Sequence, residues 1–261
     1  MTRRIALTRA VSASLAHCEL TYLSRTAIDP ERARQQHAAY EALLGSPSFG
    51  WQIVRLPTLD DQPDAVFVED AGLALDEVAI VAPMGAASRL AESRTVEDAL
   101  ATYLPVRHLT PPATLDGGDV LRVGRRLFVG LSQRTNSAAV TQLGRLLAPY
   151  EYEVIPVSVA GALHLKSACS HVGGNVLLAN PEWLDVTPFG GMEILPIEPS
   201  EAWGASVLHD EGRIVMPAGF PLTARLLQGR GLDVHVLDLS ELRKAEGGPT
   251  CLSILLPSPV T

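Results

Sequence analysis

Five polar residues recur along this chain of 261 residues at nearly equal intervals. Each lies near the start or the end of a short apolar run, and the five are Asp70, Asp116, His164, Asp210 and Cys251. Successive members are separated by 41 to 48 residues. A near-constant period of this size is typical of one supersecondary unit used several times, as in solenoids, propellers and closed pseudo-symmetric arrays.

Five such units would close into a ring if the two ends of the chain met. Equivalent positions of the units would then converge on the axis of the ring. The five polar residues would lie together there, although they are far apart in the sequence. This arrangement predicts one domain over residues 1–261, with a functional site drawn from the whole length of the chain.

The repeated unit combines strands and helices. Short apolar runs that follow polar, often glycine-containing turns predict β-hairpins. The first helix signal is Asp29, Pro30 and Glu31, which supply an N-cap, a proline at the first helical position and an acid in the first turn. That helix should end at about Leu44, before Gly45. Further helices are expected at 95–104, 136–148 and 221–230, and strands at 5–7, 51–56, 78–83, 106–109, 127–130, 153–157, 175–179, 213–216 and 234–237.

Composition and charge exclude several kinds of partner. The net charge is -8, no Lys/Arg cluster is present and aromatic residues make up 5%, which argues against binding to nucleic acid. The apolar part of segment 1–7 is too short for a signal peptide, and no apolar run approaches membrane-spanning length. The three cysteines, Cys18, Cys169 and Cys251, are odd in number and form no CxxC motif. We therefore expect free thiols and a reducing, cytoplasmic location.

One of these thiols is a candidate nucleophile. Cys251 follows the turn Gly247-Gly248-Pro249 and precedes an apolar run, a suitable position for a reactive side chain. His164 could act as its acid and base, and Asp116 could orient the histidine, as in other nucleophile–base–orienter sets. The alternative is that Cys251 is a small buried hydrophobe, as most free cysteines are.

Longer local strings are more specific than these residue types alone. They occur in the order Phe67-Val68-Glu69-Asp70, Leu115-Asp116-Gly117-Gly118-Asp119-Val120-Leu121, Gly130-Leu131-Ser132-Gln133-Arg134-Thr135-Asn136, Leu163-His164-Leu165-Lys166-Ser167 and Gly247-Gly248-Pro249-Thr250-Cys251. Together they resemble the dimethylarginine dimethylaminohydrolases of the guanidine-modifying (pentein) superfamily, over essentially the whole chain. The resemblance implies an α/β fold, a five-bladed pseudo-symmetric propeller of ββαβ units with the active site on its axis.

The resemblance also implies catalytic roles. Cys251 matches the nucleophile that attacks the guanidinium carbon, His164 the general acid and base, and Asp116 its carboxylate partner. Asp70, with Glu69 beside it, matches the carboxylate that grips the guanidinium. A planar cation suits carboxylates, which can bind it through two hydrogen bonds.

The other end of the substrate is matched by four further residues. Asp64 resembles the residue that binds the α-amino group. Arg89 and Arg134 resemble the contacts to the carboxylate, for which the fork of a guanidinium is well shaped. Leu20 falls in the stretch that matches a mobile lid. The alternatives for the arginines are an ion pair of Arg89 with Glu92 and a surface position for Arg134.

The expected activity is hydrolysis of an Nω-methylated arginine to citrulline and a methylamine through a covalent Cys251 adduct. We expect no cofactor and no metal, because Cys169, His171 and His164 match no standard zinc spacing. The expected partner is a small arginine derivative, with no nucleic acid or membrane; a homodimer is left open. Arginine deimination or another guanidine modification remains an alternative, and so does a silent binder of arginine analogues.

Overall fold

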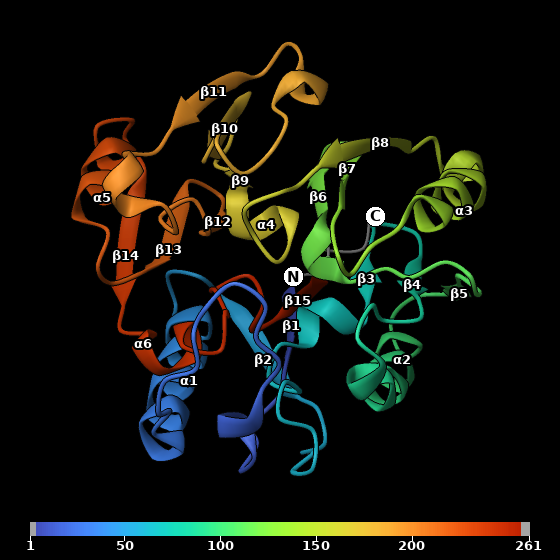
Figure 1. The fold of residues 1–261 in the computed structure, drawn as a ribbon, viewed down its shortest axis with the longest axis horizontal. Helices are drawn as coiled ribbons and strands as arrows, with labels where there is room; N and C mark the ends of the chain where they lie inside the picture. Colours follow the sequence, from blue (N-terminus) through green and yellow to red (C-terminus); the bar gives the residue numbers. More distant parts are fainter. Residues whose placement is uncertain (1–3, 257–261) are drawn as a thin grey trace.

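In the computed structural model, residues 4–256 are described; Met1, Thr2 and Arg3 of the basic N-terminal segment lie outside that range, as do residues 257–261. Within it the strands form five three-stranded sheets, which stand around a common axis (Figure 1). In every sheet the inner strand is antiparallel to the middle strand, and the outer strand is parallel to it. The predicted five-unit α/β ring is confirmed.

The strands occupy equivalent places in the five units. The inner strands are β3 (Leu73–Ala74), β6 (Val120–Val123), β9 (Cys169–His171), β12 (Leu208–Asp210) and β15 (Ile254–Leu256). The middle strands are β4 (Ala79–Val81), β7 (Arg126–Leu131), β10 (Val176–Ala179), β13 (Arg213–Pro217) and β1 (Arg4–Thr8). The outer strands are β5 (Val106–His108), β8 (Glu153–Ser158), β11 (Glu193–Pro196), β14 (Asp233–Leu237) and β2 (Trp51–Arg55).

Helices connect the middle strand to the outer strand in four of the units. They are α1 (Pro30–Leu44), α2 (Ser93–Leu100), α3 (Ser137–Leu147) and α5 (Pro221–Gln228). In the unit of β10 and β11 this connection contains only the 3-10 turn η6 (Thr187–Phe189). Two short helices, α4 (Leu165–Ala168) and α6 (Ser240–Arg243), come before β9 and β15. The predicted ββαβ unit is therefore present, with its helix missing once.

The local signals explain where the helices begin. Asp29 caps α1, because its side chain accepts hydrogen bonds from the backbone N–H groups of Glu31 and Arg32. Asn136 caps α3 in the same way. The expected end of α5 at Gly231 was wrong: the helix ends at Gln228, and the backbone N–H of Gly229 closes it.

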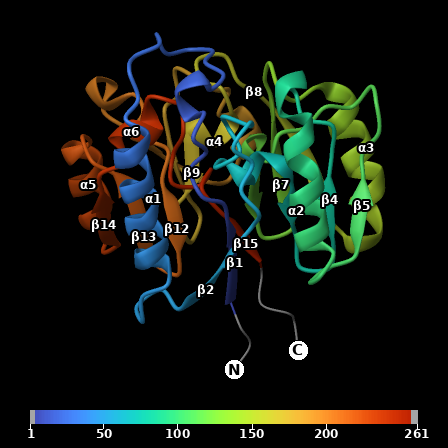
Figure 2. The ribbon, with the colours of Figure 1, turned by 90° about the horizontal axis from the view of Figure 1, so that it is seen from below.

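The last strand of the chain completes the first unit. β15 pairs antiparallel with β1, in register Ile5↔Leu256 and Leu7↔Ile254, and β1 pairs parallel with β2. Figure 2 shows β1 and β15 side by side at the centre of the molecule. Leu7 and Ile254 then belong to one buried apolar cluster with side chains of α2. The ring is thus closed by strand pairing between its two ends.

Asp210 does not join the other four polar residues, so its predicted convergence was wrong. It lies at the end of β12, whereas Asp70, Asp116, His164 and Cys251 precede their inner strands. Its carboxylate pairs with Arg4 and accepts a hydrogen bond from Trp51 Nε1 at 3.2 Å. Asp210 recurs at the same interval as the other four residues because the strands are evenly spaced in the sequence, and not because it belongs to the site.

None of the helices in residues 4–256 is long and apolar enough to cross a membrane.

Candidate active site

Four of the five repeated residues meet at one end of the axis. Asp70, His164 and Cys251 line a small pocket, and Asp116 lies directly behind His164. Each of the four precedes the inner strand of a different unit. The structure brings together seven of the nine residues that the sequence assigned to the site, because the same pocket is also lined by Asp64, Arg89 and Arg134.

His164 is held between two carboxylates. Its Nε2 lies 3.1 Å from Oδ2 of Asp116, and its Nδ1 lies 3.7 Å from Oδ1 of Asp70. All three side chains are buried. Burial alone would favour neutral imidazole, but Asp70 and Asp116 outweigh it and raise the pKa of His164 to about 9. The ring is thus an imidazolium at neutral pH and can donate a proton.

The glycines of the Leu-Asp-Gly-Gly string make this geometry possible. A Cβ on Gly118 would lie 2.7 Å from both Nδ1 of His164 and Oδ1 of Asp70. The Gly118 backbone N–H also donates to Oδ1 of Asp70 at 3.1 Å. A larger residue would therefore separate the histidine from its carboxylate.

Cys251 is presented by the turn before β15. The backbone N–H of Gly248 donates to its Sγ at 3.4 Å. A Cβ on Gly247 would lie 2.2 Å from the ring of Phe67, so the turn packs closely only with glycine there. Burial, together with the charges of Glu69 and Asp70, raises the pKa of the Cys251 thiol to about 12. The free protein therefore holds a protonated thiol, and a bound cation would favour the thiolate.

The other two thiols, Cys18 and Cys169, are fully buried. Burial raises the pKa of each. They have the character of core side chains, as expected of most free cysteines.

Asp70 is fixed by Arg89. Nη1 of Arg89 lies 2.7 Å from Oδ2 of Asp70, and its Nε and Nη2 contact Glu92 at 3.0 and 2.9 Å. Burial would raise the pKa of Asp70, but His164 and Arg89 lower it to about 2. The ion pair of Arg89 with Glu92, one of the two alternatives, is present. The contact of Arg89 with a substrate carboxylate stays a prediction.

Arg134 has a free donor in the site. Its side chain is buried, and Nη1 lies 4.0 Å from Oδ2 of Asp116, beyond hydrogen-bond distance. That atom has no hydrogen-bond partner among the described residues. A surface position for Arg134 is therefore wrong, and its guanidinium is available to an anion.

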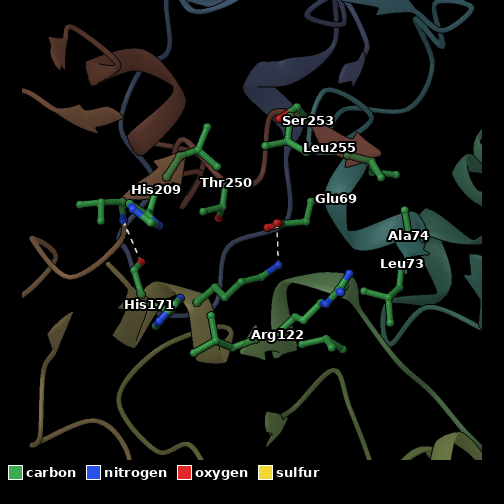
Figure 3. Close-up of a pocket in the computed structure, with 18 residues that line it drawn as sticks. Glu69, Leu73, Ala74, Arg122, His171, His209, Thr250, Ser253 and Leu255 are labelled. Atoms are coloured by element: carbon green, nitrogen blue, oxygen red, sulfur yellow. Dashed lines mark hydrogen bonds and ion pairs between the residues drawn. The ribbon is translucent and has the colours of Figure 1, made fainter. Parts of the chain in front are cut away.

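Glu69 points away from the pocket of Cys251, into a cavity on the axis that all five inner strands line. Figure 3 shows Glu69 in this cavity. Its Oε1 pairs with Nζ of Lys166 at 2.6 Å. Its second oxygen, Oε2, is buried and has no partner among the described residues. Burial raises the pKa of Glu69. The backbone N–H of Glu69 donates to the carbonyl of Cys251 at 3.3 Å, so the backbones of the two residues are adjacent.

The segment around Leu20 lies beside the pocket. Leu20 is half-buried and packs against the apolar cluster that contains Cys18. Its side chain does not line the pocket. Its neighbour Glu19 does line it, and the Glu19 backbone N–H donates to Oδ2 of Asp64 at 3.0 Å. Burial raises the pKa of Asp64.

Two buried acids near the site carried no assigned role in the sequence. Asp119, the second acid of the string Leu115-Asp116-Gly117-Gly118-Asp119, accepts hydrogen bonds from the backbone N–H of Leu165 at 2.9 Å and from Ser132 Oγ at 2.6 Å. Burial raises its pKa to about 6. Glu246 also lines the pocket. Its only sequence signal is an acid directly before Gly-Gly, which by itself points to no function.

Asp70, Asp116 and His164 also offer ligand atoms within 4.8 Å of one another. Two carboxylates and an imidazole could hold a metal ion. The same two carboxylates equally suit an organic cation, and Asp70 already uses its oxygens for Arg89 and Gly118. The expected absence of a metal therefore stays a prediction.

Comparison with known proteins points to one family. A family model described as N,N dimethylarginine dimethylhydrolase, eukaryotic, matches residues 19–187. An N(G),N(G)-dimethylarginine dimethylaminohydrolase of Streptomyces coelicolor is 38% identical over 257 residues, which are 98% of this chain and 98% of that protein. The protein of the same name from Pseudomonas aeruginosa is 32% identical over 87% of this chain and 89% of its own length.

Solved structures show the same fold. A cysteine-to-serine mutant of the Pseudomonas aeruginosa enzyme, complexed with citrulline, matches with a TM-score of 0.91 at 30% identity, covering 98% of this chain and 100% of that chain. A dimethylarginine dimethylaminohydrolase adduct with S-methyl-L-thiocitrulline matches with a TM-score of 0.90 at 30% identity, covering 98% of this chain and 100% of that chain. The N-terminal domain of a cyanobacterial arginine dihydrolase gives 0.87 at 19%, over 98% of each chain, a likeness of fold alone.

Proposed function

We infer the activity from the family: the chain belongs to the dimethylarginine dimethylaminohydrolases, which its relatives and the matching family model show. We propose that it hydrolyses the guanidinium group of an Nω-methylated arginine, giving citrulline and a methylamine. One solved relative is complexed with citrulline, and another is an adduct with S-methyl-L-thiocitrulline. Citrulline is the product of such a reaction, and the thiocitrulline is an analogue of the arginine side.

The unbalanced charge around the pocket carries this proposal for the chain itself. Burial raises the pKa of the Cys251 thiol, and the negative charges of Glu69 and Asp70 raise it further, more than Lys166 lowers it. Nη1 of Arg134, a buried donor near Asp116, lacks a hydrogen-bond partner among the described residues. Buried polar atoms are normally paired. An arginine derivative supplies both missing groups, a cationic guanidinium for the thiol and a carboxylate for the arginine.

The guanidinium end of the substrate is assigned to the acids around Cys251. Asp70 would bind it, because its carboxylate lines the pocket beside the thiol. Glu69 would contribute its negative charge from behind the thiol, since its side chain lies in the axial cavity. A direct contact of Glu69 with the guanidinium would require its carboxylate to leave Lys166.

The remaining contacts belong to the amino-acid end of the substrate. We assign the carboxylate to Arg134 and the α-ammonium to Asp64, whose buried carboxylate lines the pocket. Arg89 would assist with the carboxylate only by exchanging one of its present contacts to Asp70 or Glu92. Leu20 would contribute as part of the segment beside Asp64.

The reaction follows from the protonation states. The guanidinium lowers the pKa of Cys251 when it binds, because it brings a positive charge to a thiol whose pKa the protein raises. The thiol proton passes to water, because His164 is already protonated, and the thiolate then bonds to the guanidinium carbon. Protonated His164 donates to the leaving nitrogen as its bond to carbon breaks, which releases the methylamine and leaves a thiouronium on Cys251.

Hydrolysis of that intermediate uses the same histidine. Neutral His164 takes a proton from water, and the hydroxide bonds to the central carbon. The carbon–sulfur bond breaks, the proton of the added hydroxyl passes to the sulfur, and citrulline leaves. Asp116 keeps the imidazole ring oriented through Nε2 in both steps.

The test is an assay for citrulline with arginine, monomethylarginine and dimethylarginine as separate substrates. We expect citrulline from the methylated substrates and little from arginine. Turnover of arginine alone would contradict the proposal and favour a deiminase. No turnover of any substrate, with binding retained, would favour a silent binder.

The role of the thiol has its own control. Cys251→Ser should abolish citrulline release, whereas Cys18→Ser should retain it, because Cys18 lies outside the pocket lining. Full activity in Cys251→Ser would rule out the thiol mechanism.

The expected location and oligomeric state also stay proposals. We keep the cytoplasmic location, to be tested by cell fractionation, and the homodimer, to be tested by the mass measured in solution.

A further inference from the structure

One buried carboxylate at the pocket has no role in the proposed reaction. Glu246 lies between α6 and the Gly247-Gly248 turn, and it lines the pocket of Cys251. Its backbone φ is 60°, in the left-handed region that favours glycine. In residues 4–256 the other non-glycine residues with positive φ are Glu151 and Glu211, and both are exposed. Only Glu246 of these three turns its carboxylate into the protein.

That carboxylate binds three consecutive backbone N–H groups. Thr21 N lies 3.1 Å from Oε1, and the N atoms of Tyr22 and Leu23 each lie 2.6 Å from it. Successive N–H groups that converge on one point form an anion-binding nest. Hydrogen bonds to an ionised acceptor are also stronger than neutral ones. Glu246 thus grips a segment more than two hundred residues away in the sequence.

The other end of this segment, residues 19–23, is held across the pocket. The backbone N–H of Glu19 donates to Oδ2 of Asp64 at 3.0 Å. Ser88 Oγ donates to Oε1 of Glu19 at 2.7 Å. The segment therefore spans from Asp64 on one side to Glu246 on the other, beside the pocket that Glu19 lines.

We propose that Glu246 is a positioning residue, a clasp that fixes segment 19–23 over the pocket and shields Cys251. The clasp and the nucleophile share one turn, since Glu246 precedes Gly247 and the Gly248 N–H contacts the thiol. Segment 19–23 in turn contacts Asp64. The consequence for substrate, tighter binding of the amino-acid end, rests on the proposed function; the clasp itself does not.

Removal of the carboxylate frees the segment to open. Thr21 and Tyr22 are exposed, so water can replace Glu246 at their N–H groups, and nothing else among the described contacts holds these N–H groups in place. We expect the backbone amides of residues 21–23 to exchange with deuterium about tenfold faster or more in Glu246→Ala, because a charge-assisted hydrogen bond to each is lost.

The exchange experiment compares three variants with the parent protein. Glu246→Gln retains an acceptor without the charge, and should give intermediate exchange. Glu151→Ala is the matched control, because Glu151 also has a left-handed backbone (φ 59°) and its side chain is exposed, away from residues 19–23. It should leave residues 21–23 unchanged. Parent-like exchange in a folded Glu246→Ala, or in Glu246→Gln if the alanine variant does not fold, would overturn the clasp.

Reactivity and kinetics give independent readouts. Alkylation of Cys251 by iodoacetamide should be faster in Glu246→Ala, because the shield is loosened. With dimethylarginine, KM should rise about tenfold while kcat changes by less than about threefold, the pattern of lost substrate binding. A fall in kcat with unchanged KM and unchanged alkylation would contradict the proposal.

The two proposals fail separately. If no variant and no parent protein releases citrulline while exchange and alkylation change as expected, the clasp stands and the proposed function falls. If the parent releases citrulline but exchange at 21–23 is the same in all variants, the clasp falls and the function stands.

Discussion

At the scale of single residues, the site is a row of alternating charges. The order is Arg134, Asp116, His164, Asp70 and Arg89, with neighbouring atoms at 4.0, 3.1, 3.7 and 2.7 Å. Asp70 lies between two cations, which lower its pKa to about 2, so it stays ionised although it is buried. The histidine, between two carboxylates, stays protonated. The thiol is the exception: burial raises its pKa, the charges of Glu69 and Asp70 raise it further, and it stays neutral until a cation binds.

A pH experiment tests the state of the thiol. Between pH 7 and pH 10 the alkylation rate of Cys251 should rise by about tenfold per pH unit, because the thiolate fraction grows in that proportion below the pKa. The raised pKa of about 12 predicts no plateau in this range. Iodoacetamide labelling followed by mass spectrometry gives the rate, with Cys251→Ser as the reference. A plateau below about pH 9 would show that the free protein already activates the thiol.

At the scale of elements, α1 supports the nucleophile from a distance. The helix packs against α6, which precedes the Cys251 turn. The Asp29 backbone N–H donates to Oε2 of Glu241 in α6, and Oε1 of Gln36 accepts from the Glu241 N–H. Tyr40 of α1 shares a hydrogen bond of 2.7 Å with Ser253, next to β15. The position of the last turn therefore depends on a helix near the start of the chain.

The cap of α1 is a measurable part of that support. Asp29→Ala should lower the free energy of unfolding by about 1 kcal/mol, because two backbone N–H groups lose their acceptor. Urea unfolding followed by circular dichroism measures the change. Asp29→Asn is the matched control and should retain most of the stability, since its side-chain oxygen can accept the same bonds. Equal losses in both variants would indicate that the charge, and not the cap, matters.

At the scale of the whole molecule, the ring is closed by the pairing of β1 with β15 and not by any covalent link between these strands. Four of the five units contribute one of the repeated polar residues, each placed before its inner strand, to the site. The unit of β12 contributes none of these residues there. Closure therefore brings Cys251 to a site whose other members come from residues 64–164.

A circular permutant tests this view of closure. A chain that begins at Gly191 and ends at Gly190, with the two natural ends joined by a flexible linker, should fold to the same ring. The new break falls in an exposed loop, where a break is tolerated, and β1 and β15 would pair as neighbours in one segment. Citrulline release and circular dichroism should match the parent closely. An unfolded permutant would show that chain order, and not strand pairing alone, determines the ring.

Much of the fold could be predicted because it depends on local chemistry. Asp29 and Asn136 cap their helices at the predicted residues, since a cap needs only backbone groups two or three residues away. The repeat of polar residues predicted the five units. The predicted end of α5 was wrong by two residues, because Gly229 and Gly231 can each end a helix and packing selects between them.

Sequence alone thus specifies the repeated unit, its helix caps and the residue types that a guanidine chemistry needs. Which of these residues meet depends on the packing of the closed ring. Glu69 adjoins Asp70 in the chain and yet faces the cavity on the axis, while Asp210 keeps the period and lies at the other end of its strand. The carboxylate of Glu246 accepts hydrogen bonds from three backbone N–H groups more than two hundred residues away in the sequence. Local patterns act over a few residues, whereas side-chain direction and long-range partners are fixed only when the five units assemble.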